Sequence, residues 1–138
     1  MRALPIGWVL PHDQAKRRRQ VTIAMSRATH ADPTAPVAAC VIAACASWAV
    51  ENASPSMLLE AATEEAREAA QAATTEVRLA EMLTQVFAGT WEPPANGISP
   101  DPYDTVAAVL WCATRATSLR NGLVAPSSRA AIPIPSPR

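Results

Sequence analysis

Residues that mark redox, metal or nucleophilic chemistry are scarce in this sequence. It has three cysteines and two histidines among 138 residues. Cys40, Cys45 and Cys112 all lie in apolar stretches, and no Cys-x-x-Cys pair occurs. An odd number of cysteines without that spacing argues against a disulfide framework and against a zinc site. We therefore expect buried, reduced thiols in a cytoplasmic protein.

An excess of one charge and the common catalytic motifs are absent as well. Lys and Arg number 12 and Asp and Glu number 12, so no overall attraction to nucleic acid or to a membrane follows. The first residues contain no long apolar segment, which argues against a signal peptide. The sequence contains no glycine-rich phosphate loop and no Ser–His–Asp arrangement, and no cluster of His, Asp and Glu has the spacing of metal ligands. The sequence therefore predicts no catalytic residue and no metal ligand.

An apolar helix is predicted near the centre of the chain, over residues 37–50. It has no polar face, so other elements must surround it. It is shorter than the roughly 20 apolar residues that a membrane span needs. With hydrophobic residues at 49%, the chain is long enough for one domain with a core. We predict an all-α fold, an orthogonal multi-helix bundle with this helix at its centre.

Further helices are predicted on both sides of the central one. The first spans about 13–28, is capped by Asp13 and buries a narrow apolar stripe. The second begins at Ser54-Pro55, after the central helix. The third spans about 76–88 and ends at Gly89, and the fourth begins at Asp101-Pro102. The expected buried side chains on these elements are Val21, Ala24, Met25, Leu58, Ala62, Ala66, Ala69, Ala73, Leu79, Met82, Leu83, Val86, Phe87, Trp8, Trp48 and Trp111.

Two charged stretches have a functional and a plainer interpretation. The basic run Lys16-Arg17-Arg18-Arg19 could bind nucleic acid, but without interleaved aromatic residues we expect part solvated face and part ion pairs. The glutamates at 60, 64 and 68 could hold a metal, but like charges at that spacing repel each other and a solvated face is favoured.

The start of the central helix carries the candidate binding site. Asp32 with Pro33, or Thr34 with Pro36, can begin the helix. Thr29-His30-Ala31-Asp32 then lies at a helix N-terminus, where free N–H groups and the macrodipole favour an anion such as a phosphate. The alternative is that Asp32 is only a cap and His30 only a turn histidine.

Three segments in order carry a resemblance to a known family. They are Met1-Arg2-Ala3-Leu4-Pro5-Ile6-Gly7, then Thr29-His30-Ala31-Asp32-Pro33 before an apolar helix, and then Asp104-Thr105-Val106-Ala107-Ala108-Val109-Leu110-Trp111, followed by Arg115 and Thr117-Ser118-Leu119. Over residues 1–125 the chain resembles the ADP-ribosylglycohydrolases, of the dinitrogenase reductase-activating type.

The resemblance implies an all-α hydrolase that cleaves the glycosidic bond between ADP-ribose and a protein side chain or small molecule. It implies that His30 and Thr29 contact ADP-ribose, that Arg2 lies beside the diphosphate, and that ADP-ribose or an ADP-ribosylated protein is the partner. The family uses two magnesium ions, held by a Thr-Asp-Asp set and a Gly-Gly-Asp-Thr-Asp-Thr set.

The chain departs from the family at both metal sets, which it lacks. We therefore expect a domain incomplete at both ends, with no bound magnesium and no hydrolase activity. The alternative is a non-catalytic ADP-ribose-binding or helical interaction module, with self-association through exposed apolar surface.

Residues 126–138 differ in character from the rest. Prolines 133, 135 and 137 forbid a helix, and we expect a disordered tail. One coding sequence for Gly-Gly-Asp-Thr-Asp-Thr-Val-Ala-Ala-Leu, with its first base dropped, reads Ala-Ala-Ile-Pro-Ile-Pro-Ser-Pro-Arg and then stop, which matches residues 130–138. The hypothesis is a reading frame lost near residue 125; the alternative is a natural low-complexity tail.

Overall fold

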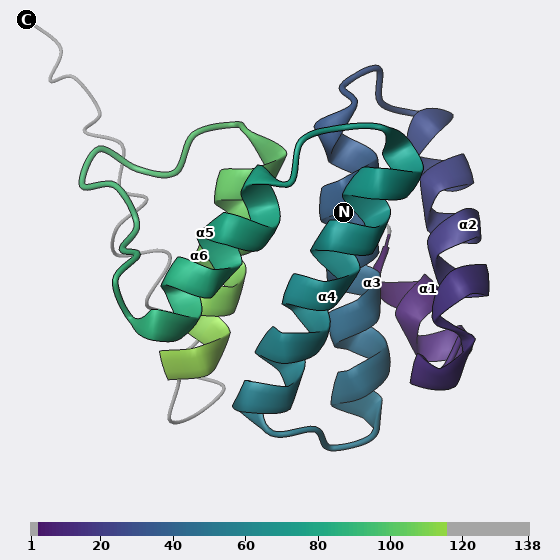
Figure 1. The fold of residues 1–138 in the computed structure, drawn as a ribbon, viewed down its shortest axis with the longest axis horizontal. Helices are drawn as coiled ribbons and strands as arrows, with labels where there is room; N and C mark the ends of the chain where they lie inside the picture. Colours follow the sequence, from purple (N-terminus) through teal and green to yellow (C-terminus); the bar gives the residue numbers. More distant parts are fainter. Residues whose placement is uncertain (1–2, 116–138) are drawn as a thin grey trace, which may run out of the picture.

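The chain forms a bundle of α-helices, and the computed structural model describes residues 3–115. Within that range there is no strand, which confirms the all-α prediction. The elements are α1 (Leu4–Val9), a short 3-10 turn η1 (His12–Gln14), α2 (Ala15–Arg27), α3 (Thr34–Val50), α4 (Pro55–Ala73), α5 (Arg78–Ala88) and α6 (Pro102–Arg115) (Figure 1). The family-like segment Thr117-Ser118-Leu119 and the tail 126–138 lie outside the described residues.

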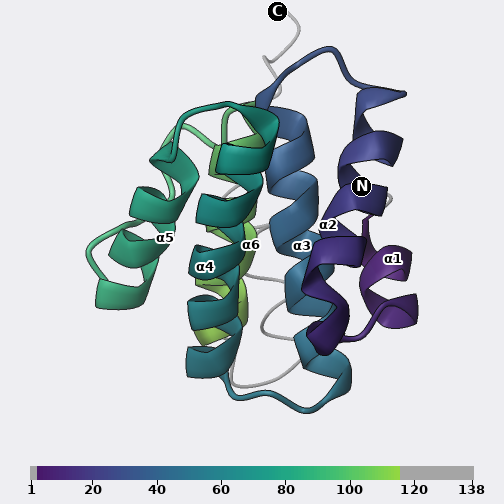
Figure 2. The same ribbon diagram turned by 45° about the vertical axis from the view of Figure 1, so that its right-hand side comes forward.

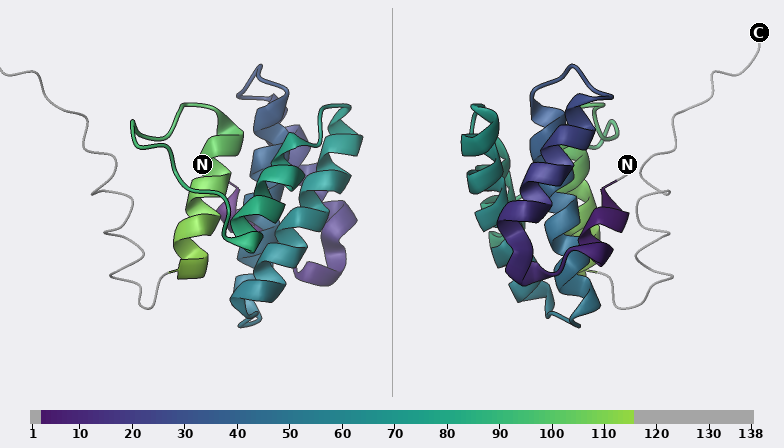
Figure 3. Two further views of the ribbon diagram at one scale, coloured as in Figure 1. Left: turned by 60° about the vertical axis from the view of Figure 1, so that its left-hand side comes forward. Right: turned by 90° about the vertical axis from the view of Figure 1, so that its right-hand side faces the viewer.

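Helix α3 is the centre of the bundle, as its uniformly apolar sequence predicts. It packs against α1 and α2 on one side and against α4 and α6 on the other (Figure 2). Val37, Val41 and Ala43 are fully buried. Helix α5 packs on α4 and α6 at the outside of the bundle (Figure 3). Within the described range, no helix is both long and apolar enough to cross a bilayer.

Helix starts and stops follow the predicted signals in three places. Ser54 caps α4 by accepting a hydrogen bond from the Met57 N–H at 3.3 Å. Asp101 caps α6, since its Oδ1 accepts from the Tyr103 N–H at 2.8 Å. Gly89 ends α5 with a φ of 76°, in the left-handed region that glycine adopts without strain.

Helix α1 approaches α3 closely because of Gly7. A Cβ at this position would lie 2.2 Å from the carbonyl oxygen of Ala43 and 2.7 Å from the Ala46 Cβ. Only glycine fits, so α1 packs its backbone directly on α3. The sequence analysis expected the Trp8 side chain to be buried. That prediction is wrong: Trp8 follows Gly7 by about 100° around the helix, and its side chain is 60% exposed.

Other predicted core residues need correction. Phe87 is 59% exposed because α5 buries the face that carries Leu83 and Val86. Trp48 and Trp111 are partly buried. Asp13 does not cap α2, because it lies within the 3-10 turn that precedes that helix, and no side chain caps α2.

Helix α2 turns a polar face inward, where the sequence analysis expected its apolar stripe. Arg18, Thr22 and Ser26 are buried, whereas Val21 is 37% and Met25 50% exposed. These three buried residues recur every four positions, so they lie along one side of the helix. The predicted stripe of Val21, Ala24 and Met25 is therefore wrong, and the reason is a charged partner on α4.

That partner is Glu65, a buried carboxylate held by two guanidinium groups. Arg19 binds it in a fork, with Nε 2.7 Å from Oε1 and Nη2 3.2 Å from Oε2. Arg18 Nη2 lies 3.7 Å from Oε2, and Arg18 Nη1 donates to the Pro11 carbonyl at 3.0 Å. Burial raises the pKa of Glu65, and the two arginines oppose that rise without cancelling it. The prediction of partial ion pairing in the basic run is confirmed.

Candidate functional site

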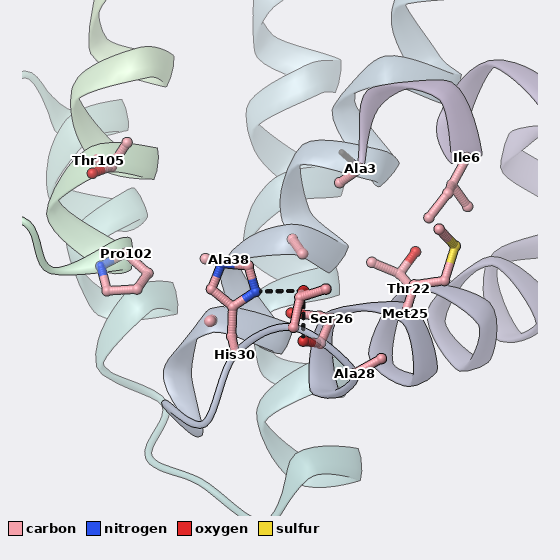
Figure 4. A pocket seen from close by; sticks show the side chains of 13 residues that line it. Ala3, Ile6, Thr22, Met25, Ser26, Ala28, His30, Ala38, Pro102 and Thr105 are labelled. Carbon is pink, nitrogen blue, oxygen red and sulfur yellow. Dashed lines mark hydrogen bonds between the residues drawn. The ribbon is translucent and has the colours of Figure 1, made fainter. Parts of the chain in front are cut away.

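A cavity of about 610 Å³ opens between α1, α2, α3 and the start of α6 (Figure 4). Its walls are mainly the small and apolar side chains of these helices. Hydroxyl groups and one imidazole supply the polar part of the lining. The lining residues are Ala3, Ile6, Thr22, Met25, Ser26, Ala28, Thr29, His30, Ala35, Ala38, Ala39, Pro102 and Thr105.

The turn after α2 fixes the position of His30 at this cavity. Helix α2 ends at Arg27, and the Ser26 carbonyl then accepts from the backbone N–H of Thr29 at 3.1 Å and of His30 at 2.9 Å. The Thr29 hydroxyl lies 2.8 Å from His30 Nδ1 and 3.2 Å from the same carbonyl oxygen. Figure 4 shows the imidazole held beside Ser26, on the side of the cavity that faces Pro102. The structure therefore brings the predicted pair Thr29 and His30 together.

Asp32 lies just before the N-cap of α3, which is Pro33, and is not part of the lining. Its Oδ1 accepts from the backbone N–H of Thr34 at 2.8 Å and from the Thr34 hydroxyl at 2.7 Å. These hydrogen bonds lower the pKa of Asp32. Its negative charge already occupies the N-terminal end of α3, where the sequence analysis expected an anionic ligand. For Asp32 the geometry supports a role at the helix start, through its hydrogen bonds to Thr34, and not a ligand contact.

The comparisons with known proteins identify the family. The model of the ADP-ribosylglycohydrolase family matches residues 1–128. The chain belongs to the ADP-ribosylglycohydrolase family. This agrees with the resemblance carried by the three ordered segments. No curated protein and no solved structure matches the chain significantly.

The magnesium ions that the family resemblance implies find no fitting set of ligands among the residues described between 3 and 115. Magnesium binds carboxylate and other hard oxygen ligands in octahedral geometry. The cavity lining contains no carboxylate, and no group of three His, Cys, Asp or Glu residues in the described range could hold a metal ion. Asp101 is engaged by Arg78 and by the Tyr103 N–H, and Asp104 accepts from the Ser99 hydroxyl at 2.6 Å.

Several lining residues escaped the sequence analysis of this glycohydrolase-family chain. Thr22 and Ser26 were not among the residues that the sequence analysis singled out, and Thr105 appeared there only as part of a family segment. The signal that could have found the first two is that Arg18, Thr22 and Ser26 recur at every fourth position and so share one face of α2. Arg2, the remaining predicted binding residue, lies outside the described range, although its neighbour Ala3 lines the cavity.

Proposed function

We propose that the cavity binds ADP-ribose through His30. The observation that carries this proposal is that one cavity gathers the family's Thr29–His30 element with hydroxyls from α2 and α6. Its volume of about 610 Å³ falls in the range of roughly 300–1,000 Å³ found for small-molecule sites. Hydroxyl and imidazole groups suit the hydroxyl-rich sugar, and alanine walls allow a flat ring to approach closely.

We further propose that residues 1–138 on their own bind this ligand without cleaving it. Glycosidic cleavage needs a group that protonates the leaving atom and a group that activates water. No carboxylate lines the cavity to play either role, since the polar side chains of the lining are hydroxyls and the His30 imidazole. The physiological partner would be ADP-ribose or an ADP-ribosylated protein.

A helical interaction module is the second candidate. Trp8 is 60% and Val9 77% exposed at the C-terminal end of α1, and such exposed apolar side chains can drive self-association. Sedimentation at several concentrations checks this role, since Trp8→Ser should lower the association constant if α1 mediates it. Unchanged association would remove α1 from consideration.

A cytoplasmic location fits the thiols of α3. Cys40 and Cys45 form no disulfide, and burial raises the pKa of each to about 12. Both thiols are therefore chemically unreactive, as in proteins of reducing compartments.

Two assays test the main proposal. Calorimetric titration with ADP-ribose should give saturable binding that His30→Ala weakens, while Arg67→Ala on the exposed face of α4 serves as a control without effect. A glycohydrolase assay on an ADP-ribosylated peptide, with and without magnesium, should show no turnover. Turnover that depends on magnesium would contradict the binding-only role, and absence of binding would contradict the assignment of the cavity.

A further inference from the structure

The hydrogen bonds around Thr29 constrain the protonation state of His30 as well as its position. Thr29 Oγ1 lies within hydrogen-bond range of His30 Nδ1, at 2.8 Å, and of the Ser26 carbonyl oxygen, at 3.2 Å. A threonine hydroxyl has a single hydrogen to share between these two neighbours. Which neighbour receives it decides which nitrogen of the imidazole carries the ring proton.

The carbonyl oxygen of Ser26 can only accept a hydrogen bond. Both contacts are therefore hydrogen bonds in one arrangement only: the hydroxyl donates to Ser26 and accepts from an N–H at Nδ1 of His30. The neutral imidazole then carries its proton on Nδ1 and its lone pair on Nε2. Among the described residues, no group forms a hydrogen bond with Nε2, so this lone pair is available at the cavity.

We propose that Thr29 is a positioning residue, whose hydroxyl orients the His30 ring and holds it in the Nδ1–H form so that Nε2 accepts a hydrogen bond from a hydroxyl of the ligand. A ribose hydroxyl can donate to such an acceptor, whereas a deprotonated phosphate oxygen, as in the diphosphate of ADP-ribose, cannot. Thr29 thus acts through His30 and need not touch the ligand. The tautomer is inferred from the two contacts of the Thr29 hydroxyl, and the identity of the ligand rests on the proposed function.

Nitrogen-15 NMR of the imidazole rings tests the tautomer directly in the full chain without ligand. The measurement is made near pH 8.5, about two units above the ordinary imidazole pKa of roughly 6.5. The resonances of His30 are those missing in His30→Ala, since His12 is the other histidine. We expect Nδ1 at the position of a protonated nitrogen and Nε2 at that of a bare one. Thr29→Ser should keep this pattern and Thr29→Val should lose it.

An Nε2–H form in the unmodified chain, or the same pattern in the unmodified chain and Thr29→Val, would overturn the proposal. Thr29 is exposed, so neither substitution removes a core contact. Far-ultraviolet circular dichroism of both variants checks that the helical content is unchanged.

Ligand titrations separate this proposal from the proposed function. ADP-ribose should shift the Nε2 resonance, whereas inorganic pyrophosphate should not. Thr29→Val should bind ADP-ribose about threefold to tenfold more weakly, the value of one hydrogen bond, and Thr29→Ser should bind normally. Equal affinity in the unmodified chain and Thr29→Val would overturn the positioning role while leaving the cavity assignment intact. An Nδ1–H form without ADP-ribose binding would support the tautomer and contradict the proposed function.

Discussion

Replacing Glu65 by alanine removes the carboxylate that joins α2 to α4. The Glu65 side chain is 5% exposed and that of Arg18 only 3%, so the change leaves a buried guanidinium without its partner. Breaking a buried ion pair from one side costs about 3–5 kcal/mol. We expect the free energy of unfolding to fall by an amount in that range. The cost should exceed that of losing an ordinary surface pair several times over.

Glu68 supplies the matched control on the same helix. It contacts Arg19 at 3.3 Å, but its side chain is 52% exposed. Solvent screening limits such pairs to about 0–1 kcal/mol, so Glu68→Ala should have a small effect. The two glutamates share the partner Arg19, but Glu65 is buried and also contacts Arg18, whereas Glu68 is half exposed.

Urea unfolding followed by circular dichroism at the helix band measures both changes. With a denaturant slope of about 2 kcal/mol per molar, a loss of about 4 kcal/mol lowers the midpoint by about 2 M, and Glu68→Ala lowers it by less than about 0.5 M. If Glu65→Ala does not fold, Glu65→Gln keeps the shape and part of the hydrogen bonding. Equal midpoints for the Glu65 and Glu68 variants would refute the reasoning that burial makes this pair critical.

Three further predictions concern packing, pH and the gene. Gly7→Ala should lower the free energy of unfolding by about 1–3 kcal/mol, the usual cost of overpacking, because the new Cβ meets the Ala43 carbonyl. Thermal unfolding measures this loss. An unchanged melting temperature would contradict the close contact of α1 and α3. For Asp101, partial burial raises the pKa, but the hydrogen bonds from Arg78 and the Tyr103 N–H lower it overall. A carboxylate whose pKa is lowered in the folded state contributes its full stabilisation above the ordinary aspartate pKa of about 3.9, and this stabilisation is lost as the pH falls through the folded-state pKa. Asp101→Asn should therefore lower the stability at pH 7 and make no difference in strong acid. Resequencing the gene around codon 125 should reveal a Gly-Gly-Asp-Thr-Asp-Thr motif in the neighbouring frame; a sequence that encodes none would contradict the frame-loss hypothesis.

The sequence predicts the helices of this chain well because their signals are local. Ser54 with Pro55, Asp101 with Pro102, and Gly89 each satisfy helix-end N–H or C=O groups through residues close by in the chain. The run within α3 is apolar on every side, so this helix must be surrounded by other helices and lie at the centre of the bundle.

Prediction from the sequence fails where the orientation of a helix depends on a contact with a residue far away in the chain. Arg19 and Glu65 are 46 residues apart, so periodicity alone could not show that α2 turns a charged face inward. The direction of Trp8 depends on Gly7 contacting α3, a contact that no pattern within α1 reveals. For the candidate site, Thr29 and His30 were predicted from their family-like sequence. The hydroxyls of Thr22 and Thr105 come from two other helices that the fold brings to the cavity.

Calorimetric titration of the purified chain with ADP-ribose tests the central claim, that the cavity beside His30 is a ligand site. We predict saturable binding that is unaffected by magnesium and weakened by His30→Ala. Binding that magnesium enhances would contradict the finding that residues 3–115 hold no group of metal ligands. No binding by a folded, monomeric chain would contradict the ligand site itself.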